Sequence, residues 1–279
     1  MGGTMYDNVI AAAGQLPFVR DYFQGKIDKD TFRDEVLKNR DLLVSLGLDE
    51  PLVRIFSRFP NNEKDASERM LNTMHSTGMI ESCKFDEQGY LSWKYLILQK
   101  FAHLPDRYTS IFPEETRVAY ALSKALHPRN IFVAGSYYGY LSVWLIPGIA
   151  PNGRMVCSDI DPDVCLVAER NMKALGVSDR VDIKCEDAET LLKKGKVPVD
   201  LFVLDAIGKR SNHEPQYRGK AIYFPLIKAA LPRLHNRSFV LAHNADKDSV
   251  DLSAFFKVVG KAGFFMLLNT TDNIGIFRL

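Results

Sequence analysis

Cysteine is scarce in this 279-residue sequence, and it does not occur in pairs. The four cysteines are Cys83, Cys157, Cys165 and Cys185, and no two of them form a Cys-x-x-Cys pair. This spacing signals neither a zinc cluster nor a dithiol motif. Four scattered thiols in a chain of this length are typical of a reducing compartment rather than of a disulfide scaffold. We therefore expect a cytoplasmic protein.

The sequence also lacks a large excess of either charge and any long apolar run. Lys and Arg number 36 against 34 Asp and Glu, whereas a dedicated nucleic-acid binder usually carries a marked basic excess. No apolar run approaches the roughly 18 residues that span a bilayer, and the first residues do not resemble a secretory signal. We therefore expect neither a nucleic-acid nor a membrane partner. Hydrophobic residues make up 46%, which is typical of a globular chain with one large domain or two modest ones.

Helical periodicity dominates the chain between Tyr6 and about His103. Apolar residues recur at three- and four-residue spacing over residues 32–48, and a further helix is expected over residues 68–75. The turn-prone segment 86–89 leaves a small hairpin open as an alternative to helix there. We predict that residues 1–108 form a helical cap or a dimerisation region, and the latter would make the protein a homodimer.

Strand-like and helix-like runs alternate in the rest of the chain. Apolar runs typical of buried strands cover residues 131–134, 155–158, 181–185, 201–204 and 239–242. This alternation predicts right-handed βαβ crossovers and a mostly parallel sheet. Residues 264–268 and 274–277 predict two further strands joined by a short turn. We therefore expect residues 109–279 to form a Rossmann-like, doubly wound α/β domain with a C-terminal antiparallel hairpin.

Glycines and acids stand where the predicted parallel strands end. The first strand runs into Gly-Ser-Tyr-Tyr-Gly-Tyr at 135–140, and its two glycines allow a sharp turn and close approach of a ligand. Asp159, Asp187 and Asp205 follow the next three strands. Each acid by itself is more ordinarily a helix N-cap or a loop charge. Because ligands of open parallel sheets bind beyond the carboxyl ends of the strands, the set together predicts a ligand site there.

With these residues, the second half of the chain resembles the class I S-adenosylmethionine-dependent methyltransferases, and residues 112–140 resemble the lead-in of the cation-dependent O-methyltransferases. The further matching pieces are Ser-Asp-Ile-Asp-Pro at 158–162, Glu-Asp-Ala at 186–188 and Asp-Leu-Phe-Val-Leu-Asp-Ala at 200–206. The resemblance covers a little over half of the chain. It implies S-adenosylmethionine as co-substrate or substrate.

The resemblance also implies which residues bind that molecule. The loop 135–140 would wrap its methionine part, Asp159 would bind the ribose hydroxyls, Ile160 would pack on adenine, and Asp187 would face the adenine amino group. The complete implied set is Gly135, Ser136, Gly139, Tyr140, Asp159, Ile160, Asp187, Ala188 and Asp205.

Two positions depart from the family pattern. Val133 stands where the family usually has an acid that helps to hold the α-ammonium of the cofactor. Asp205 matches the first ligand of the magnesium-type ion, but His243 and Asn244 replace the Asp-Asn pair that supplies the others. Since magnesium prefers oxygen ligands, we expect no obligatory metal.

The expected catalytic residues are Tyr137, Tyr138, His243 and Asn244. The tyrosine faces could contact the sulfonium, a cation–π interaction of roughly 0.5–2 kcal/mol. His243 is the general-base candidate, because it lies at a predicted strand end beside Asn244. The polar loop 207–220 is either a lid over the site or a solvated loop.

Four functions follow from this pattern, and methyl transfer to an oxygen or nitrogen of a small-molecule substrate is the first. The second is cyclisation of S-adenosylmethionine itself to azetidine-2-carboxylate with release of methylthioadenosine, which Val133, the altered metal position and the aromatic loop favour. A nicotinamide-dependent oxidoreductase is disfavoured, since Gly-x-x-x-Gly is not the dinucleotide-binding spacing. A non-catalytic interaction protein is the fourth.

Overall fold

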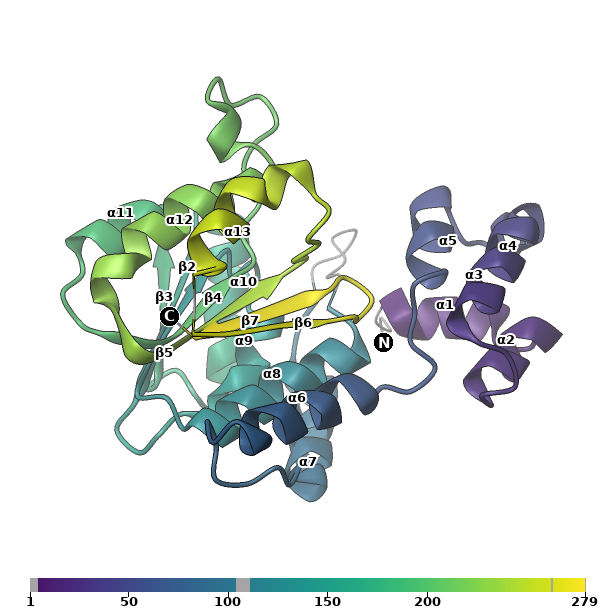
Figure 1. Cartoon of the computed structure of the whole chain (residues 1–279), viewed down its shortest axis with the longest axis horizontal. Coiled ribbons are helices and arrows are strands. Elements are labelled where there is room, and N and C mark those ends of the chain that lie inside the picture. The colour runs from purple at the N-terminus through teal and green to yellow at the C-terminus, as the bar shows by residue number, and fades with distance from the viewer. Residues whose placement is uncertain (1–4, 104–110, 262, 279) are drawn as a thin grey trace.

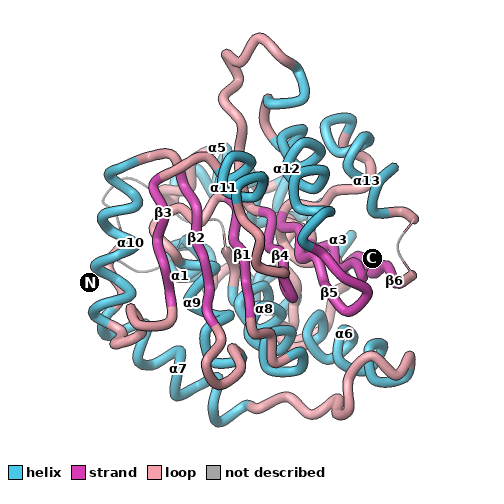
Figure 2. The backbone as a smooth tube through the Cα atoms, turned by 90° about the vertical axis from the view of Figure 1, so that its left-hand side faces the viewer, coloured by secondary structure: helices cyan, strands magenta, loops and turns pink. Residues whose placement is uncertain are grey.

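The computed structural model describes residues 5–103, 111–261 and 263–278. Its centre is a seven-stranded sheet in the order β3-β2-β1-β4-β5-β7-β6. The strands are β1 Asn130–Ala134, β2 Arg154–Asp159, β3 Val181–Cys185, β4 Val199–Leu204, β5 Leu234–His243, β6 Phe264–Leu268 and β7 Ile274–Arg278. Strands β1 to β5 are parallel, and β7 runs antiparallel to both β5 and β6. The predicted Rossmann-like sheet with its antiparallel hairpin is confirmed, and Figure 2 shows its parallel strands side by side.

Helices cover both faces of this sheet (Figure 1). One face packs against α6 Asp65–Ser76, α7 Glu87–Lys100, α8 Pro113–Leu126, α9 Tyr140–Leu145 and α10 Pro162–Ala174. The other packs against α11 Ala188–Lys194, α12 Tyr223–Ala230 and α13 Ser253–Val259. Because both faces are covered, the strands read as continuous apolar runs: Val133 points into the first layer and Phe132 into the second.

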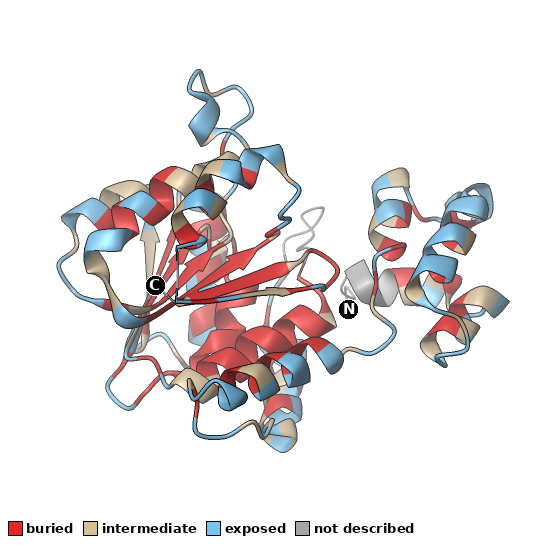
Figure 3. Ribbon diagram, viewed as in Figure 1, coloured by how far each residue is buried: buried red, intermediate tan, exposed pale blue. Residues whose placement is uncertain are grey.

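A separate helical unit precedes these layers and is called the N-terminal unit below. It consists of α1 Met5–Ala13, α2 Pro17–Phe23, α3 Lys29–Lys38, α4 Arg40–Ser45 and α5 Glu50–Phe56. Its core is aromatic: the rings of Tyr22 and Phe32 stack with centroids 3.9 Å apart. Figure 3 shows that its helices bury only one side, whereas the central strands and α8 are buried almost throughout.

The packing divides the helical region differently from the sequence prediction. Helices α6 and α7 belong to the layer under the sheet and not to the N-terminal unit. The expected boundary between residues 108 and 109 lies outside the described residues. Contact between the two parts runs through Phe59 and Phe112, whose ring centroids are 5.2 Å apart.

The hairpin considered around residues 79–91 is wrong. Asp86 is the N-cap of α7, and its Oδ1 accepts a hydrogen bond from the Gly89 backbone N–H at 3.0 Å. The same Asp and Gly that suggest a turn thus satisfy the free amide of a helix start. Within the described part of the chain, no helix has the length and apolar character needed to cross a membrane.

Candidate active site

A cavity of about 430 Å³ opens at the carboxyl ends of β1, β2 and β4, and it is called the strand-end cavity below. The described residues that line it are Ile111, Gly135, Ser136, Tyr137, Tyr140, Leu141, Asp159, Asp161, Asp205, Ala206, Ile207 and Asn244. Seven of these were singled out from the sequence. The other five are Ile111, Leu141, Asp161, Ala206 and Ile207. They were not singled out, because an apolar residue or an acid that caps a helix carries no local signal of contact with a ligand.

The loop between β1 and α9 is shaped by glycine and by one strained tyrosine. Gly135 has φ +79°, and a Cβ there would lie 2.3 Å from the Cα of Ala206. Only glycine therefore lets the loops after β1 and β4 approach so closely. Tyr137 has φ 50°, a left-handed conformation that is uncommon for a residue with a Cβ. Tyr137 lines the cavity, as does Tyr140.

Asp159 holds this loop in place from the end of β2. Its Oδ2 accepts a hydrogen bond from the Tyr137 backbone N–H at 2.8 Å, and its Oδ1 accepts one from the Asp161 N–H at 3.1 Å. Burial raises the pKa of Asp159, and these backbone bonds work in the opposite direction. A carboxylate offers about four lone-pair positions, so Asp159 retains capacity to accept hydrogen bonds from a ligand.

His243 lies behind the cavity wall, between two carboxylates. Its Nδ1 is 3.0 Å from Asp205 Oδ1, and its Nε2 is 3.1 Å from Glu115 Oε2. Burial by itself lowers the pKa of His243, but the two carboxylates outweigh it and raise the pKa to about 10. The imidazole is therefore a cation at neutral pH, and its side chain is only 1% exposed. This environment does not suit the general-base role expected of His243.

Lys220 adds a second cation to the same carboxylate. Its Nζ lies 3.2 Å from Asp205 Oδ1 and donates to the Tyr223 hydroxyl at 3.0 Å. Burial raises the pKa of Asp205, but His243 and Lys220 outweigh it, and the pKa lies below its ordinary value. Neither Lys220 nor Glu115 was found from the sequence, since Glu115 stands 128 positions before His243.

The residues at the family's metal position do not fit a divalent ion. Asp205 would be its first ligand, but the Asp205 Oδ1 already faces two cations. His243 has both ring nitrogens directed at carboxylates, so the imidazolium has no lone pair to offer. Over the described ranges, no group of three or more His, Cys, Asp or Glu side chains is arranged to hold a metal.

Six of the sequence-predicted residues lie outside the cavity lining: Tyr138, Gly139, Ile160, Asp187, Ala188 and His243. Tyr138 is fully buried and packs near Phe101, with ring centroids 5.9 Å apart. Ile160 is 57% exposed, and Ala188 is buried under α11.

Asp187 is the N-cap of α11. Its Oδ1 accepts hydrogen bonds from the backbone N–H and the hydroxyl of Thr190 at 2.8 and 2.9 Å. The loop after β4 is pinned at its base by pairing of Gly208 with Gly219, and it projects from the molecule at the top of Figure 1.

Comparison with known proteins agrees with this arrangement. Residues 132–245 match the family model described as a methyltransferase domain. The catechol O-methyltransferase of Niastella koreensis is 27% identical over 101 residues, which are 35% of this chain and 46% of that protein. The catechol O-methyltransferase of Mycobacterium tuberculosis is 34% identical over 86 residues, 30% of this chain and 39% of that protein. The chain thus spans less than half the length of these curated relatives.

Solved structures show the same fold. The O-methyltransferase from Bacillus cereus in complex with S-adenosylhomocysteine superposes with a TM-score of 0.52 at 16% identity, covering 68% of this chain and 91% of that one. Cofactor-bound Rv0187 from M. tuberculosis gives a TM-score of 0.51 at 20% identity, covering 69% and 90%. The matched segment carries β1, β2 and β4 with the residues at their ends. Residues 132–245 therefore match a methyltransferase domain family, and the chain shares the fold of these solved structures.

Proposed function

We propose that this protein is an S-adenosylmethionine-dependent enzyme that transfers a methyl group to an oxygen or nitrogen of a small molecule. The observation that carries the proposal is the strand-end cavity, where Asp159 and the loop 135–140 form one wall. The methyltransferase match covers these residues, and its curated relatives are catechol O-methyltransferases.

The cavity suggests how S-adenosylmethionine would be held. Asp159 would accept hydrogen bonds from the ribose hydroxyls, as acids at the end of the second strand commonly do. The rings of Tyr137 and Tyr140 would lie beside the sulfonium, where each aromatic face contributes roughly 0.5–2 kcal/mol. Ile160, Asp187 and Ala188 stay proposed contacts of the adenine, although Asp187 already caps α11.

His243 would act through Asp205 rather than on the substrate. It does not line the cavity, whereas Asp205 does. Together with Lys220 it holds the Asp205 carboxylate ionised and fixed in position. Asp205 and Asn244 are then the polar groups that orient the acceptor or the amino-acid end of the cofactor, and His243 is a positioning residue.

A second candidate is cyclisation of S-adenosylmethionine. In that reaction the neutral α-amine attacks its own Cγ, the Cγ–S bond breaks, and azetidine-2-carboxylate and methylthioadenosine form. The amine loses its proton to solvent or to a cavity carboxylate. Two observations favour it: Val133 is a buried apolar side chain where the family's acid would hold the ammonium, and His243 is unavailable to deprotonate an acceptor.

Product analysis separates these functions. The protein would be incubated with S-adenosylmethionine alone and with a panel of catechols and amines, followed by mass spectrometry. Methyl transfer gives S-adenosylhomocysteine only when an acceptor is added. Azetidine-2-carboxylate with methylthioadenosine, formed without acceptor above the no-enzyme rate, would overturn methyl transfer as the main activity. If S-adenosylmethionine did not raise the melting temperature, the result would favour a non-catalytic interaction protein. A ligand that binds the folded state must stabilise that state.

The same assay tests whether the reaction needs a divalent ion, which the residues around Asp205 do not fit. Turnover in EDTA is expected to equal turnover in magnesium, because Lys220 and His243 already neutralise Asp205. A strict requirement for magnesium, restored by the metal after chelation, would contradict the charge arrangement described for this site.

A further inference from the structure

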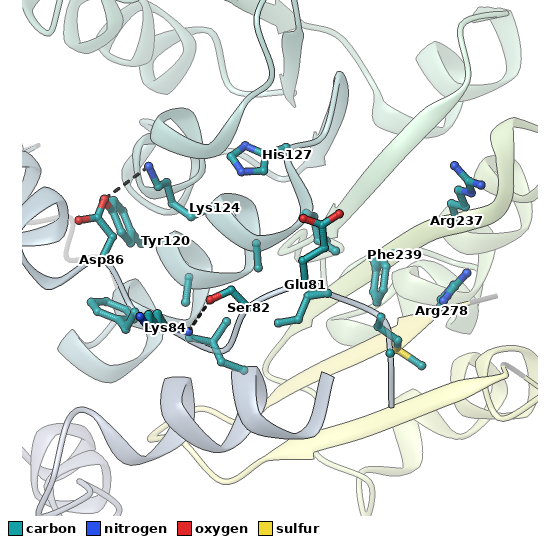
Figure 4. A pocket seen from close by; sticks show the side chains of 18 residues that line it. Glu81, Ser82, Lys84, Asp86, Tyr120, Lys124, His127, Arg237, Phe239 and Arg278 are labelled. Carbon is teal, nitrogen blue, oxygen red and sulfur yellow. Dashed lines mark hydrogen bonds and ion pairs between the residues drawn. The ribbon is translucent and has the colours of Figure 1, made fainter. Parts of the chain in front are cut away.

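A second cavity, of about 690 Å³, lies at the opposite edge of the sheet and is called the distal cavity below (Figure 4). It is bounded by the first part of β5, the end of β7, the C-terminal half of α8 and the segment 78–86. Phe239 lines it, whereas Asn244, five positions further along, lines the strand-end cavity. At 3.3 Å per residue these positions are about 16 Å apart, so the proposed reaction does not use the distal cavity.

The floor of the distal cavity is apolar. Phe239 and Leu71 are buried in the core under the sheet, and Ile80 and Ala121 close the floor from the neighbouring segments. Ligand pockets are typically lined by such apolar and aromatic groups, with a few polar groups that fix orientation.

Two arginines stand beside Phe239 on the same side of the cavity (Figure 4). Arg237 and Phe239 both come from β5 and both line the cavity. Arg278 pairs with Phe239 across the strands, and its guanidinium carbon lies 5.9 Å from the Phe239 ring centroid. Its Nε donates to the Asn236 carbonyl at 3.0 Å, and its terminal amino groups have no hydrogen-bond partner among the described residues.

The acids of the distal cavity do not neutralise these arginines. Asp86 is engaged by Lys124 at 3.4 Å, by the Tyr120 hydroxyl at 3.0 Å and by the Gly89 amide. Within the described ranges, neither Arg237 nor Lys84 has an ion-pair partner. Among the described residues that line the cavity, Glu81 is the one remaining acid, whereas Lys84, Arg237 and Arg278 are three basic residues.

We propose that the distal cavity binds a small organic anion with a flat apolar body, such as an aryl carboxylate. The carboxylate would accept hydrogen bonds from the guanidinium groups of Arg237 and Arg278, because the planar guanidinium matches its two oxygens. The aromatic body would lie against Phe239 and the apolar floor. This proposal does not depend on the reaction proposed for the strand-end cavity, and its ligand is not the methyl acceptor.

Isothermal titration calorimetry with 2-naphthoate, and with 2-naphthamide as its neutral counterpart, tests the proposal. We expect saturable binding of one naphthoate per chain and affinity at least about tenfold weaker for the amide, because the charge-assisted bonds are lost. Saturating S-adenosylhomocysteine is expected not to displace naphthoate. Equal binding of acid and amide, no saturable binding, or displacement would overturn the proposal.

Variants locate the binding. Arg237→Gln changes an exposed side chain that makes no ion pair with the described residues, and it is expected to weaken naphthoate binding at least about tenfold. Lys228→Gln, on the opposite face of the sheet in α12, is the matched control and should leave the affinity unchanged. Unchanged affinity in Arg237→Gln, with its melting temperature intact, would also overturn the proposal. Arg278→Gln is likewise expected to weaken naphthoate binding.

Discussion

At the scale of single residues, Asp159 and Asp187 have similar sequence contexts but different roles in the structure. Asp159 ends the parallel strand β2 and Asp187 follows the parallel strand β3, and a helix comes soon after each. The Asp159 carboxylate reaches across to the Tyr137 amide and lines the strand-end cavity. The Asp187 carboxylate turns back onto its own helix and caps it at Thr190.

Alanine at each position separates these roles. Asp159→Ala is expected to weaken binding of S-adenosylhomocysteine at least about tenfold, since it removes a charged acceptor and the anchor of the loop. Asp187→Ala is expected to lower the free energy of unfolding by about 1 kcal/mol through loss of the cap, with little change in affinity. Calorimetric titration and urea denaturation measure the two effects. An equal loss of affinity in both variants would instead support the adenine contact implied for Asp187.

His243 makes the stability of the protein depend on pH in a defined direction. Its folded pKa is about 10, while an unfolded histidine titrates near its ordinary value of about 6.5. The folded state therefore binds the proton more tightly, so the stabilisation is complete below about 6.5 and is lost as the pH rises through 10.

We expect the difference in unfolding free energy between the wild type and His243→Gln to shrink between pH 7 and pH 10. Urea denaturation at three pH values measures it, and His75→Gln, at an exposed helix position, controls for loss of a histidine as such. Parallel pH curves for wild type and His243→Gln would show that the imidazole is not a buried cation.

At the scale of elements, the turn from β1 into α9 has little tolerance for a side chain. Gly135 and Gly176 both have positive φ, but only at Gly135 would a Cβ meet backbone, 2.3 Å from the Cα of Ala206. At Gly176, which follows α10, nothing lies within 4 Å.

Alanine at the two glycines therefore isolates the effect of this contact. Gly176→Ala is expected to cost about 1–2 kcal/mol of unfolding free energy, the penalty of a left-handed residue alone. Gly135→Ala carries that penalty and also pushes the β1 and β4 loops apart, so it is expected to cost more and to weaken cofactor binding. Equal stabilities, with unchanged binding, would mean that the loops move apart freely.

At the scale of the whole molecule, the N-terminal unit is joined to the layers around the sheet by an aromatic and an ionic contact. Phe112, the N-cap of α8, belongs to the aromatic cluster of the N-terminal unit. Nearby, Arg58 pairs with the buried Asp272 of the β6–β7 turn at 3.0 Å. The unit is therefore anchored close to the His243 cluster, because Asp272 also donates its backbone N–H to Glu115.

Phe112→Ala is expected to lower the free energy of unfolding by about 3–5 kcal/mol, the cost of emptying a buried aromatic site. It should also speed proteolysis between α5 and α6. Phe265→Ala, at a half-exposed position, serves as the control and should cost far less. A comparable loss in both variants would mean that the contact between the two parts contributes little. The role of residues 1–108 as a cap or dimerisation region stays a prediction, and a mass measurement in solution can check the dimer.

The sequence by itself determined the sheet and most of the strand-end cavity. Apolar runs such as residues 201–204 predict buried parallel strands because a strand covered on both faces has no polar side. Parallel strands bring their carboxyl ends to one edge, so the residues after them, Asp159 and Asp205 among them, meet without any further information. Local rules of this kind depend only on neighbouring residues.

Only the tertiary structure decided the roles of the polar side chains. From the sequence, His243 resembles a base at a strand end. In the structure its Nε2 faces Glu115, 128 positions earlier, while its Nδ1 faces Asp205. The distal cavity likewise joins α8, the segment 78–86 and two strands that no local pattern relates. Burial and charge pairing are set by residues distant along the chain, and for this reason the protonation and the partners of a side chain follow from the fold.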